Sequence, residues 1–427
     1  MSIAAAGGNS GEPAADSGIG GTRGPAGARP VRRRPRDRRA QIAVAAAEAF
    51  SALGYHGVSM EEIAARLSLS STALYRHYPS KYALFRTEAL RLGAVCAAAT
   101  RFPPEAAGWS VEQRRRHLFD AVIGAGIANR RSTALLRWQG RYLEPEDRAV
   151  VAADLAAVAA AGRALLGESR PELDEPTKTV LAQSIQSIVS SIGDHHVALP
   201  ARVLADRLRA ACLAVWRCEL PPPGGPHGRP APAVPPTFTH ELVLKHAVAL
   251  FHEYGYPHVS VEDIAVAAGL PTPSAIYRFY HSKGDLLAAA FRRAADQVSA
   301  AIGPAVAAAP SPAAALTTLV DLFVAGSFAE RELTFVYYAE ISNVPSDQRK
   351  RLRAIQRLNV EEWAKLLAAT RSDLTPAEAR LLVHTAQALV IDLGRRFGSD
   401  DPTCSRQRVA HLMRIILFGD ATADAVP

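Results

Sequence analysis

Near the start of the chain, hydrophobic positions repeat with the period of an α-helix. The apolar residues are spaced i, i+3, i+4 and i+7, so they share one helical face. A glycine then ends this helix, and Ser59 with Glu62 forms a capping box that predicts the start of a second helix. The four residues of the predicted apolar stripe are Ala43, Ala46, Ala47 and Phe50.

A third helix is predicted at residues 71–78, after a tight turn at Ser68–Ser70. Pro79 breaks it, and Ser80 can cap a long fourth helix that begins near Lys81. Two short helices joined by a turn of three or four residues, the second polar on one face, are typical of a helix-turn-helix.

The residue types of the third helix suit entry into the major groove of DNA. Leu74 is predicted to anchor the helix to Ile63 and Phe50, and the opposite face is small or polar. Hydroxyl, imidazole and ammonium groups at the end of the motif can reach phosphates. The small residues are Ser71, Thr72 and Ala73, and the predicted phosphate contacts are Tyr75, His77 and Lys81.

Further Ala- and Leu-rich helices follow, and no sustained alternation of β-branched or aromatic residues predicts a strand. The fold is therefore expected to be all-α, with a helical bundle after the helix-turn-helix. The predicted bundle helices are 110–128, 133–142, 148–166, 177–192 and 201–216.

A diverged copy of the whole unit is predicted in the second part of the chain. Residues 240–291 repeat the first motif at an offset of 201, which becomes 202 after one inserted residue within 270–275. Pro145 and Pro176 have counterparts at Pro345 and Pro376, so the bundle is duplicated as well.

The second copy lacks a preceding Arg cluster, carries Pro271 and Pro273 at the start of its third helix, and has Phe279 in place of His77. It is either an altered second reader of DNA or mainly a structural partner. Its candidate DNA contacts are Ser260, Thr272, Ser274, Tyr277, Arg278 and Lys283.

Composition adds a basic bias to this picture. The formal net charge is +8, and residues 31–39 hold six arginines and one aspartate, which suits binding to nucleic acid. The four cysteines form no metal-site spacing, and we find no catalytic or nucleotide-binding motif. We therefore expect no metal, no cofactor and no enzymatic activity. No apolar run suggests a membrane span, so a cytoplasmic protein is expected.

The patterns F-x₃-G-Y-x₃-S-x₃-I-A, from Phe50, and L-Y-R-H-Y-P-S-K-x₂-L-F, from Leu74, resemble the tetracycline-repressor (TetR) family of transcription regulators. The resemblance implies base contacts from residues 71–73, base or phosphate contacts from Tyr75 and Arg76, and phosphate contacts from His77 and Lys81. Ser59 would lie near the DNA backbone. A basic arm with Arg32, Arg33 and Arg34 would reach the adjacent minor groove. The family often has Gly at positions 68 and 72, where this chain has Ser and Thr.

The resemblance also implies an effector pocket in the bundle and pairing of its last two helices with another copy. Partners would be a double-stranded DNA operator and a small-molecule effector. The chain would act as a homodimer or as an intrachain pseudo-dimer, more often as a repressor than as an activator. The alternative is a helical ligand-binding or interaction scaffold that has lost gene regulation. In the first bundle the candidate ligand contacts are Trp138, Tyr142 and His195, with Arg137 and His196 nearby. In the second bundle they are Tyr337 and Tyr338, with Glu340, Arg395 and Arg396 nearby.

The predicted organisation has two tandem units joined by a Pro/Gly linker. Each unit is a helix-turn-helix domain followed by a bundle. The first unit is expected to have a disordered segment at 1–36 with a basic arm at its end, a first head at 37–96 (motif 59–78) and a first bundle at 97–218. A linker at 219–237 follows. The second unit has a head at 238–298 (motif 260–280), a bundle at 299–420 and a tail at 421–427.

Overall fold

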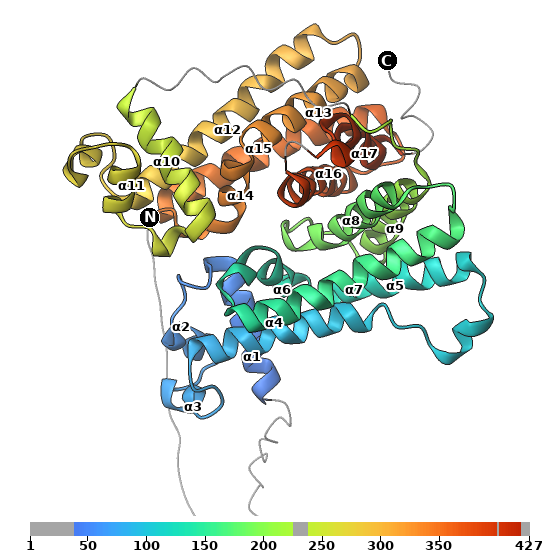
Figure 1. Ribbon diagram of the computed structural model, residues 1–427, viewed down its shortest axis with the longest axis horizontal. Helices are drawn as coiled ribbons and strands as arrows, with labels where there is room; N and C mark the ends of the chain where they lie inside the picture. The colour runs from blue at the N-terminus through green and yellow to red at the C-terminus, as the bar shows by residue number, and fades with distance from the viewer. Residues whose placement is uncertain (1–37, 225–237, 399–400, 420–427) are drawn as a thin grey trace, which may run out of the picture. The chain divides into compact units, whose positions relative to one another are not determined.

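The computed structural model describes residues 38–224, 238–398 and 401–419 (Figure 1). Within these ranges every regular element is a helix, which confirms the all-α prediction. The predicted arm, with Arg32, Arg33 and Arg34, and most of the predicted linker lie outside the described residues.

Three short helices form the first head, and the predicted capping box starts the second of them. The backbone N–H of Glu62 donates to Ser59 Oγ over 3.1 Å, and that of Ser59 donates to Glu62 Oε2 over 2.7 Å. Two orphan donors of the helix are thereby satisfied. The helices are α1 (Arg38–Leu53), α2 (Met60–Arg66) and α3 (Ser71–Tyr75).

The core of the first head is built from the predicted apolar stripe. Phe50 has no exposed surface, and Ile63 and Leu74 join it in one buried cluster. The third helix ends at Tyr75, three residues earlier than predicted. The reason is that Tyr78 turns inward: it is 1 % exposed, and its hydroxyl donates to the carbonyl of Arg39 over 3.1 Å.

The first bundle begins with a helix that it shares with the head, since α4 is continuous and packs along α7. The predicted helix at 133–142 is instead the short α6 followed by a π turn at Leu135–Gln139 and a 3₁₀ turn at Gly140–Tyr142. The helices are α4 (Lys81–Ala98), α5 (Val111–Ala128), α6 (Arg130–Ala134), α7 (Pro145–Ser169), α8 (Glu175–Ser190) and α9 (Ala201–Arg217).

The second half repeats this order of elements, including the helix that joins head and bundle. The residue that caps its second helix is Ser260, the counterpart of Ser59. Its helices are α10 (Thr239–Tyr254), α11 (Val261–Ala267), a 3₁₀ helix (Pro273–Arg278), α12 (Lys283–Ala308), α13 (Pro312–Ala329), α14 (Arg331–Glu340), α15 (Ser346–Thr370), α16 (Pro376–Phe397) and α17 (Arg406–Phe418).

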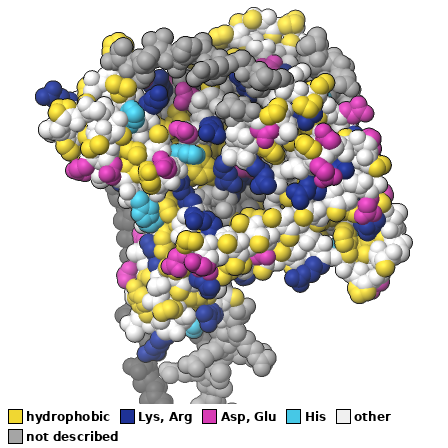
Figure 2. All heavy atoms as spheres, in the orientation of Figure 1, with side chains coloured by type: hydrophobic (Ala, Val, Ile, Leu, Met, Phe, Trp, Pro, Cys, Tyr) yellow, Lys and Arg dark blue, Asp and Glu magenta, His cyan; other side chains and the backbone are white. Residues whose placement is uncertain are grey.

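Two helices are long and apolar enough to cross a membrane by length and composition alone, which the sequence reading did not anticipate: α7 and α13. In the apolar 18-residue window of α7, 22 % of the residues are buried, and in that of α13, 33 % are buried. Figure 2 shows apolar side chains along the exposed face of α7. Both helices pack within the bundles, α7 against α4 and α8, and α13 against α12 and α15.

The two halves share one apolar core. Helix α8 packs against α16 and α9 packs against α17, so the last two helices of each half form the contact. Buried residues of both halves, such as Ile188 and Leu389, belong to the same cluster. Ser187 Oγ also donates to Asp392 Oδ2 over 2.6 Å. The helices expected to pair with another copy therefore pair within one chain.

Arg137 is a buried cation at this half–half contact. Its Nη2 lies 3.0 Å from Asp392 Oδ2, and its Nε lies 3.3 Å from Asp194 Oδ2. Its guanidinium also donates to Ser190 Oγ (2.8 Å) and to the carbonyl of Ala388 (3.2 Å). Burial raises the pKa of Asp194 to about 6, although Arg137 opposes that rise. The charges of this cluster therefore depend on one another.

Replacing Arg137 with Leu should lower the free energy of unfolding by about 3–5 kcal/mol, because the buried Asp194 and the half-buried Asp392 would lose the cation between them. Urea unfolding followed by circular dichroism measures the change. Adding Asp194→Asn and Asp392→Asn to the variant should recover most of the loss. A triple variant as unstable as Arg137→Leu alone would assign the loss to packing and not to charge.

Ser68 lies in the turn between α2 and α3 with φ of 52°, in the left-handed region. It is the one residue other than glycine with positive φ among those the structure describes. The second half has Gly269 at the equivalent place, with φ of 70°. A side chain in this conformation costs roughly 1–2 kcal/mol.

Ser68→Gly should therefore raise the free energy of unfolding by up to about 1 kcal/mol, part of the relief being offset by the greater freedom of glycine in the unfolded chain. The reciprocal change, Gly269→Ser, should lower it. Thermal unfolding of the two variants beside the unchanged protein tests the pair. Shifts of the same sign would contradict this account of the turn.

Candidate nucleic-acid interface

The exposed face of α3 carries the side chains predicted to read DNA. Thr72, Tyr75 and Arg76 are exposed, and 46 % of the surface of Tyr75 is accessible. Ser71 and Ala73 are half-buried at the start of the helix. Small side chains at this end let the helix approach base edges closely, while the longer ones reach outward.

Two other predicted contacts lie beside the core of the head. Ser59 is half-buried and engaged in the cap of α2, and His77 is half-buried next to the buried Tyr78. Their predicted roles toward the DNA backbone stay predictions.

Lys81 points its ammonium toward the head itself. Its Nζ donates to the carbonyl of Val58 over 3.1 Å and lies 4.6 Å from the centroid of the Tyr55 ring. Burial lowers the pKa of Lys81, and nearby Glu62 opposes that effect. In this structure Lys81 ties the turn after α1 to the start of α4, and its phosphate contact stays a prediction.

The second head repeats this arrangement at Lys283. Its Nζ donates to the carbonyls of Tyr256 (2.8 Å) and Val259 (2.7 Å) and lies 4.3 Å from the Tyr256 ring centroid. Burial lowers its pKa as well. Because both copies make the same contact, we assign the lysine a structural role within each head.

The reading segment of the second head differs in shape. A 3₁₀ helix at Pro273–Arg278 replaces the α-helix, and Ile276 is the buried anchor equivalent to Leu74. The hydroxyls of Thr272 and Ser274 lie 2.7 Å apart, so they engage one another. Three consecutive exposed side chains end the segment: Tyr277, Arg278 and Phe279.

Two residues hold each head against its bundle: Gln139, which the sequence did not single out, and Glu340, which was expected near a ligand. Gln139 Oε1 accepts from the backbone N–H of Tyr55 over 2.9 Å, and Glu340, 201 residues later, accepts from that of Tyr256 over 3.4 Å. Gln139 Nε2 also donates to the carbonyl of Ala339 in the other half (3.1 Å). Gln139 and Glu340 are separated by the same 201 residues as Tyr55 and Tyr256, whose N–H groups they accept from. That they bind the heads is visible only in the fold.

Contacts also cross from the first bundle to the second head. Arg141 Nη2 donates to the carbonyl of His252, at the end of α10, over 2.8 Å. The hydroxyl of Tyr142 donates to Glu340 Oε1 over 2.7 Å. Burial raises the pKa of Glu340, while Tyr142 and Arg141 oppose that rise. The imidazoles of His56 and His258, one from each head, have centroids 5.8 Å apart.

Three residues predicted to bind ligand lie at the half–half contact and do not line the cavity of the first bundle. Trp138 Nε1 donates to Asp194 Oδ1 over 2.7 Å, and its ring stacks on Tyr338. Tyr142 bonds to Glu340 as described, and His195 stacks on His384. Tyr142 also lines a separate hollow between the two heads, together with His56 and His258. The predicted ligand contacts of these three residues stay predictions.

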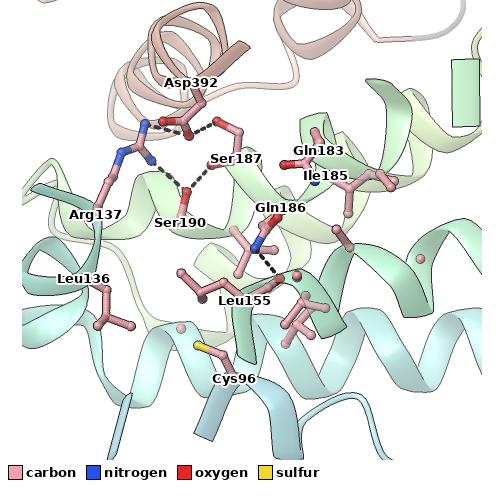
Figure 3. Close-up of a pocket in the computed structure, with 18 of the residues that line it drawn as sticks. Cys96, Leu136, Arg137, Leu155, Gln183, Ile185, Gln186, Ser187, Ser190 and Asp392 are labelled. Atoms are coloured by element: carbon pink, nitrogen blue, oxygen red, sulfur yellow. Dashed lines mark hydrogen bonds and ion pairs between the residues drawn. The ribbon is translucent and has the colours of Figure 1, made fainter. Parts of the chain in front are cut away.

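A cavity of about 580 Å³ lies in the first bundle, lined mainly by apolar side chains of α4, α5, α7 and α8. Its polar end is formed by residues of both halves (Figure 3). There Arg137 and Asp392 converge with Ser187 and Ser190. Arg163, Arg395 and Arg396 also line the cavity. With four arginines and one aspartate, the lining favours a ligand that has an apolar body and an anionic group.

Tyr337 and Tyr338, the other predicted ligand contacts, do line a separate cavity in the second bundle. No group of three His, Cys, Asp or Glu side chains suited to a metal ion occurs among the described residues.

Comparison with known proteins matches both heads to one family. The family model described as "Bacterial regulatory proteins, tetR family" matches residues 42–87 and 243–290. The HTH-type transcriptional activator FasR of Mycolicibacterium smegmatis is 46 % identical over 67 residues, which are 15 % of this chain and 31 % of FasR. The chain thus spans about a third of the length of this curated relative.

Several solved structures resemble parts of the chain. A TetR-family regulator from Bordetella parapertussis has a TM-score of 0.38 at 24 % identity, over 42 % of this chain and 94 % of its own. The ketosteroid transcriptional regulator KstR2 of Mycobacterium tuberculosis has a TM-score of 0.38 at 18 % identity, over 43 % and 95 %. The fatty acid degradation regulator FadR of Bacillus halodurans has a TM-score of 0.36 at 19 % identity, over 45 % and 98 %.

The two matched segments coincide with the two heads, and each head is followed by its own helical bundle. Both heads therefore match the tetR family of bacterial regulatory proteins, and the matched region is present twice in tandem.

Proposed function

We propose that this chain is a transcription regulator that binds an operator in double-stranded DNA as an intrachain pseudo-dimer. One observation carries the proposal: two helix-turn-helix heads with exposed reading segments are joined through the packing of α8 and α9 against α16 and α17. In a homodimeric regulator this pairing would join two chains and match a palindrome. A single chain with two unequal heads would instead match two unequal half-sites.

The first head is the primary reader in this proposal. Its α3 is a regular helix with Thr72, Tyr75 and Arg76 exposed, and the predicted basic arm precedes it. The second head presents a 3₁₀ helix and the exposed phenyl ring of Phe279. A phenyl ring cannot donate a hydrogen bond to phosphate, so the second head should add less to affinity and specificity.

Ligand control would act through the half–half contact. The polar end of the first cavity is the ion pair between Arg137 and Asp392, which joins the halves over 3.0 Å. An anionic ligand group that reaches Arg137 would compete with Asp392 for the guanidinium. The ligand would then favour a different packing of the halves and change the spacing of the heads. The ligand is proposed to lower affinity for the operator.

The direction of regulation is a separate question. Repression is our prediction, whereas FasR, which is similar to one part of the chain, is described as an activator. A promoter fusion with and without the intact chain measures the direction. The alternative function, a scaffold without gene regulation, predicts equal affinity for operator and random DNA, or none.

A pseudo-dimer predicts one chain per operator. Sedimentation of the free protein should give a mass close to that of a single chain, 45.5 kDa. With a short operator duplex, the complex should have the mass of one chain plus that of the duplex. Hydroxyl-radical footprinting should then show two unequal half-site patterns. The operator itself would come from selection of genomic fragments by the intact chain.

Two chains on one operator, with identical protection of both half-sites, would contradict the pseudo-dimer while leaving DNA binding intact. A variant with the first head deleted provides the control, because it should keep the half–half contact and lose most of the footprint.

Arg76→Ala should weaken operator binding by about tenfold or more. If Arg76 contacts a phosphate, the change should also flatten the salt dependence of the affinity; if it contacts a base, it should relax the preference at one base pair. Arg278→Ala, the matched change 202 residues later, should have a smaller effect because its segment is a 3₁₀ helix. Fluorescence anisotropy over a series of salt concentrations measures both. An equal or larger effect of Arg278→Ala would reverse the ranking of the two heads.

A further inference from the structure

The first part of helix α15 carries a dense group of positive charges. Residues 349–357 hold five cations and no carboxylate. Four of these cations are exposed, and within the described residues none of the four makes an ion pair. The ion pairs of α15 lie further along the helix, at Glu361 and Glu362. We call the four exposed residues the basic ridge: Lys350, Arg351, Arg353 and Arg357.

The charges of this segment repel one another in the free protein. Arg349, Arg353 and Arg357 follow at intervals of four residues, and like charges at that spacing destabilise a helix. Partial burial lowers the pKa of Arg353, and the charges of Arg349 and Arg357 lower it further, while Tyr337 opposes them. An anionic partner on the exposed side of α15 would relieve this repulsion.

The first half has no such ridge. Arg148 and Arg349 are equivalent, because each guanidinium donates to a carbonyl seven residues earlier, that of Arg141 (3.5 Å) and that of Ser342 (2.5 Å). Helix α7 packs against α4 and α8 as α15 packs against α12 and α16. At the offset of 201 the ridge positions are uncharged in α7, so the four cations are not needed for this packing. The equivalent residues, all exposed, are Ala149, Val150, Ala152 and Ala156.

The ridge begins beside the second head. Gln348 Nε2 donates to Asp285 Oδ1 over 2.5 Å, and Asp285 lies in the first turn of α12, which leads from the second head into its bundle. In the proposed function this head binds one half-site of the operator. Lys350 follows Gln348 by two residues, so the ridge starts at the end of the bundle that adjoins this head.

The second head itself offers few cations to phosphate. No Arg cluster precedes it, and Phe279 stands in place of His77. The ammonium of Lys283 is turned toward the carbonyls of Tyr256 and Val259. Positive charge beside this head would therefore add to its affinity for DNA.

We propose that the basic ridge binds backbone phosphates of the operator beside the half-site of the second head. The inference rests on the proposed function. Guanidinium groups bind phosphate through two parallel hydrogen bonds, and each phosphate contact releases counterions from DNA. An anionic membrane fits less well, because a helix on a membrane surface needs an apolar face beside its cations. In α15, which is described throughout, Leu358 is the one exposed large apolar side chain.

A variant with Lys350→Gln, Arg351→Gln and Arg353→Gln tests the ridge. Fluorescence anisotropy of the full chain with its operator should show an affinity lowered by about tenfold or more at about 0.15 M salt. Over a series of salt concentrations, the slope of log affinity against log salt should fall by about two to three, because each phosphate contact adds about 0.9. The melting temperature should not fall, since the changes remove repulsion.

The matched control removes the same charge from exposed positions elsewhere, on α9 and on the later part of α15: Arg202→Gln, Arg217→Gln and Lys365→Gln. Its affinity should change by less than about threefold and its slope by less than about one, because salt screens distant charges. Hydroxyl-radical footprinting should also show that the ridge variant loses protection beside the second half-site and keeps the protection of the first.

Equal effects of the ridge variant and the control on affinity would assign them to net charge and overturn the inference. So would an unchanged footprint beside the second half-site, or a ridge variant that loses binding to vesicles of anionic phospholipid while its operator binding stays intact. Absence of operator binding by the unchanged chain would instead refute the proposed function, and the inference about the ridge with it.

Discussion

The contact between the last two helices of each half governs the rest of the molecule. It buries apolar side chains from both halves in one core, and such burial is the main favourable term in folding. Within it, Arg137 pairs with Asp194 of its own half and with Asp392 of the other, so one guanidinium links the two halves. Helices α4 and α12 run from the heads into the bundles that meet here. The positions of both heads therefore follow from this contact.

The two copies agree at the lysine that holds each head together and differ at one position beside the reading segment. Lys81 and Lys283 make the same inward contacts with a carbonyl and a tyrosine ring. His77 and Phe279, at equivalent places near the reading segments, have unrelated chemistry. A packing contact inside the head constrains both copies equally, because each must fold. A contact with DNA constrains the side chain of a copy only if that copy binds DNA at this position. The difference between His77 and Phe279 is therefore consistent with unequal roles for the two heads.

Sequence reasoning predicted the elements well and the partners poorly. The apolar stripe ending at Phe50 and the anchor at Leu74 were predictable, because helical period and caps are local properties. The inward direction of Lys81 was not, since spacing gives a position along a helix and not the group that the end of a long side chain meets. Nor did the sequence indicate that the Trp138 ring stacks on Tyr338 of the other half. Only the fold decides whether an aromatic residue on an apolar helix faces a cavity or another half.

Duplication within one chain also changes what ligand binding can do. In a symmetric homodimer both pockets are the same, so two sites report one signal. Here Arg137 lines a cavity rich in arginine, whereas Tyr338 lines a cavity without Lys, Arg or His. Both side chains touch Trp138. The two cavities of one chain are therefore free to diverge in lining, whereas the identical pockets of a homodimer are not.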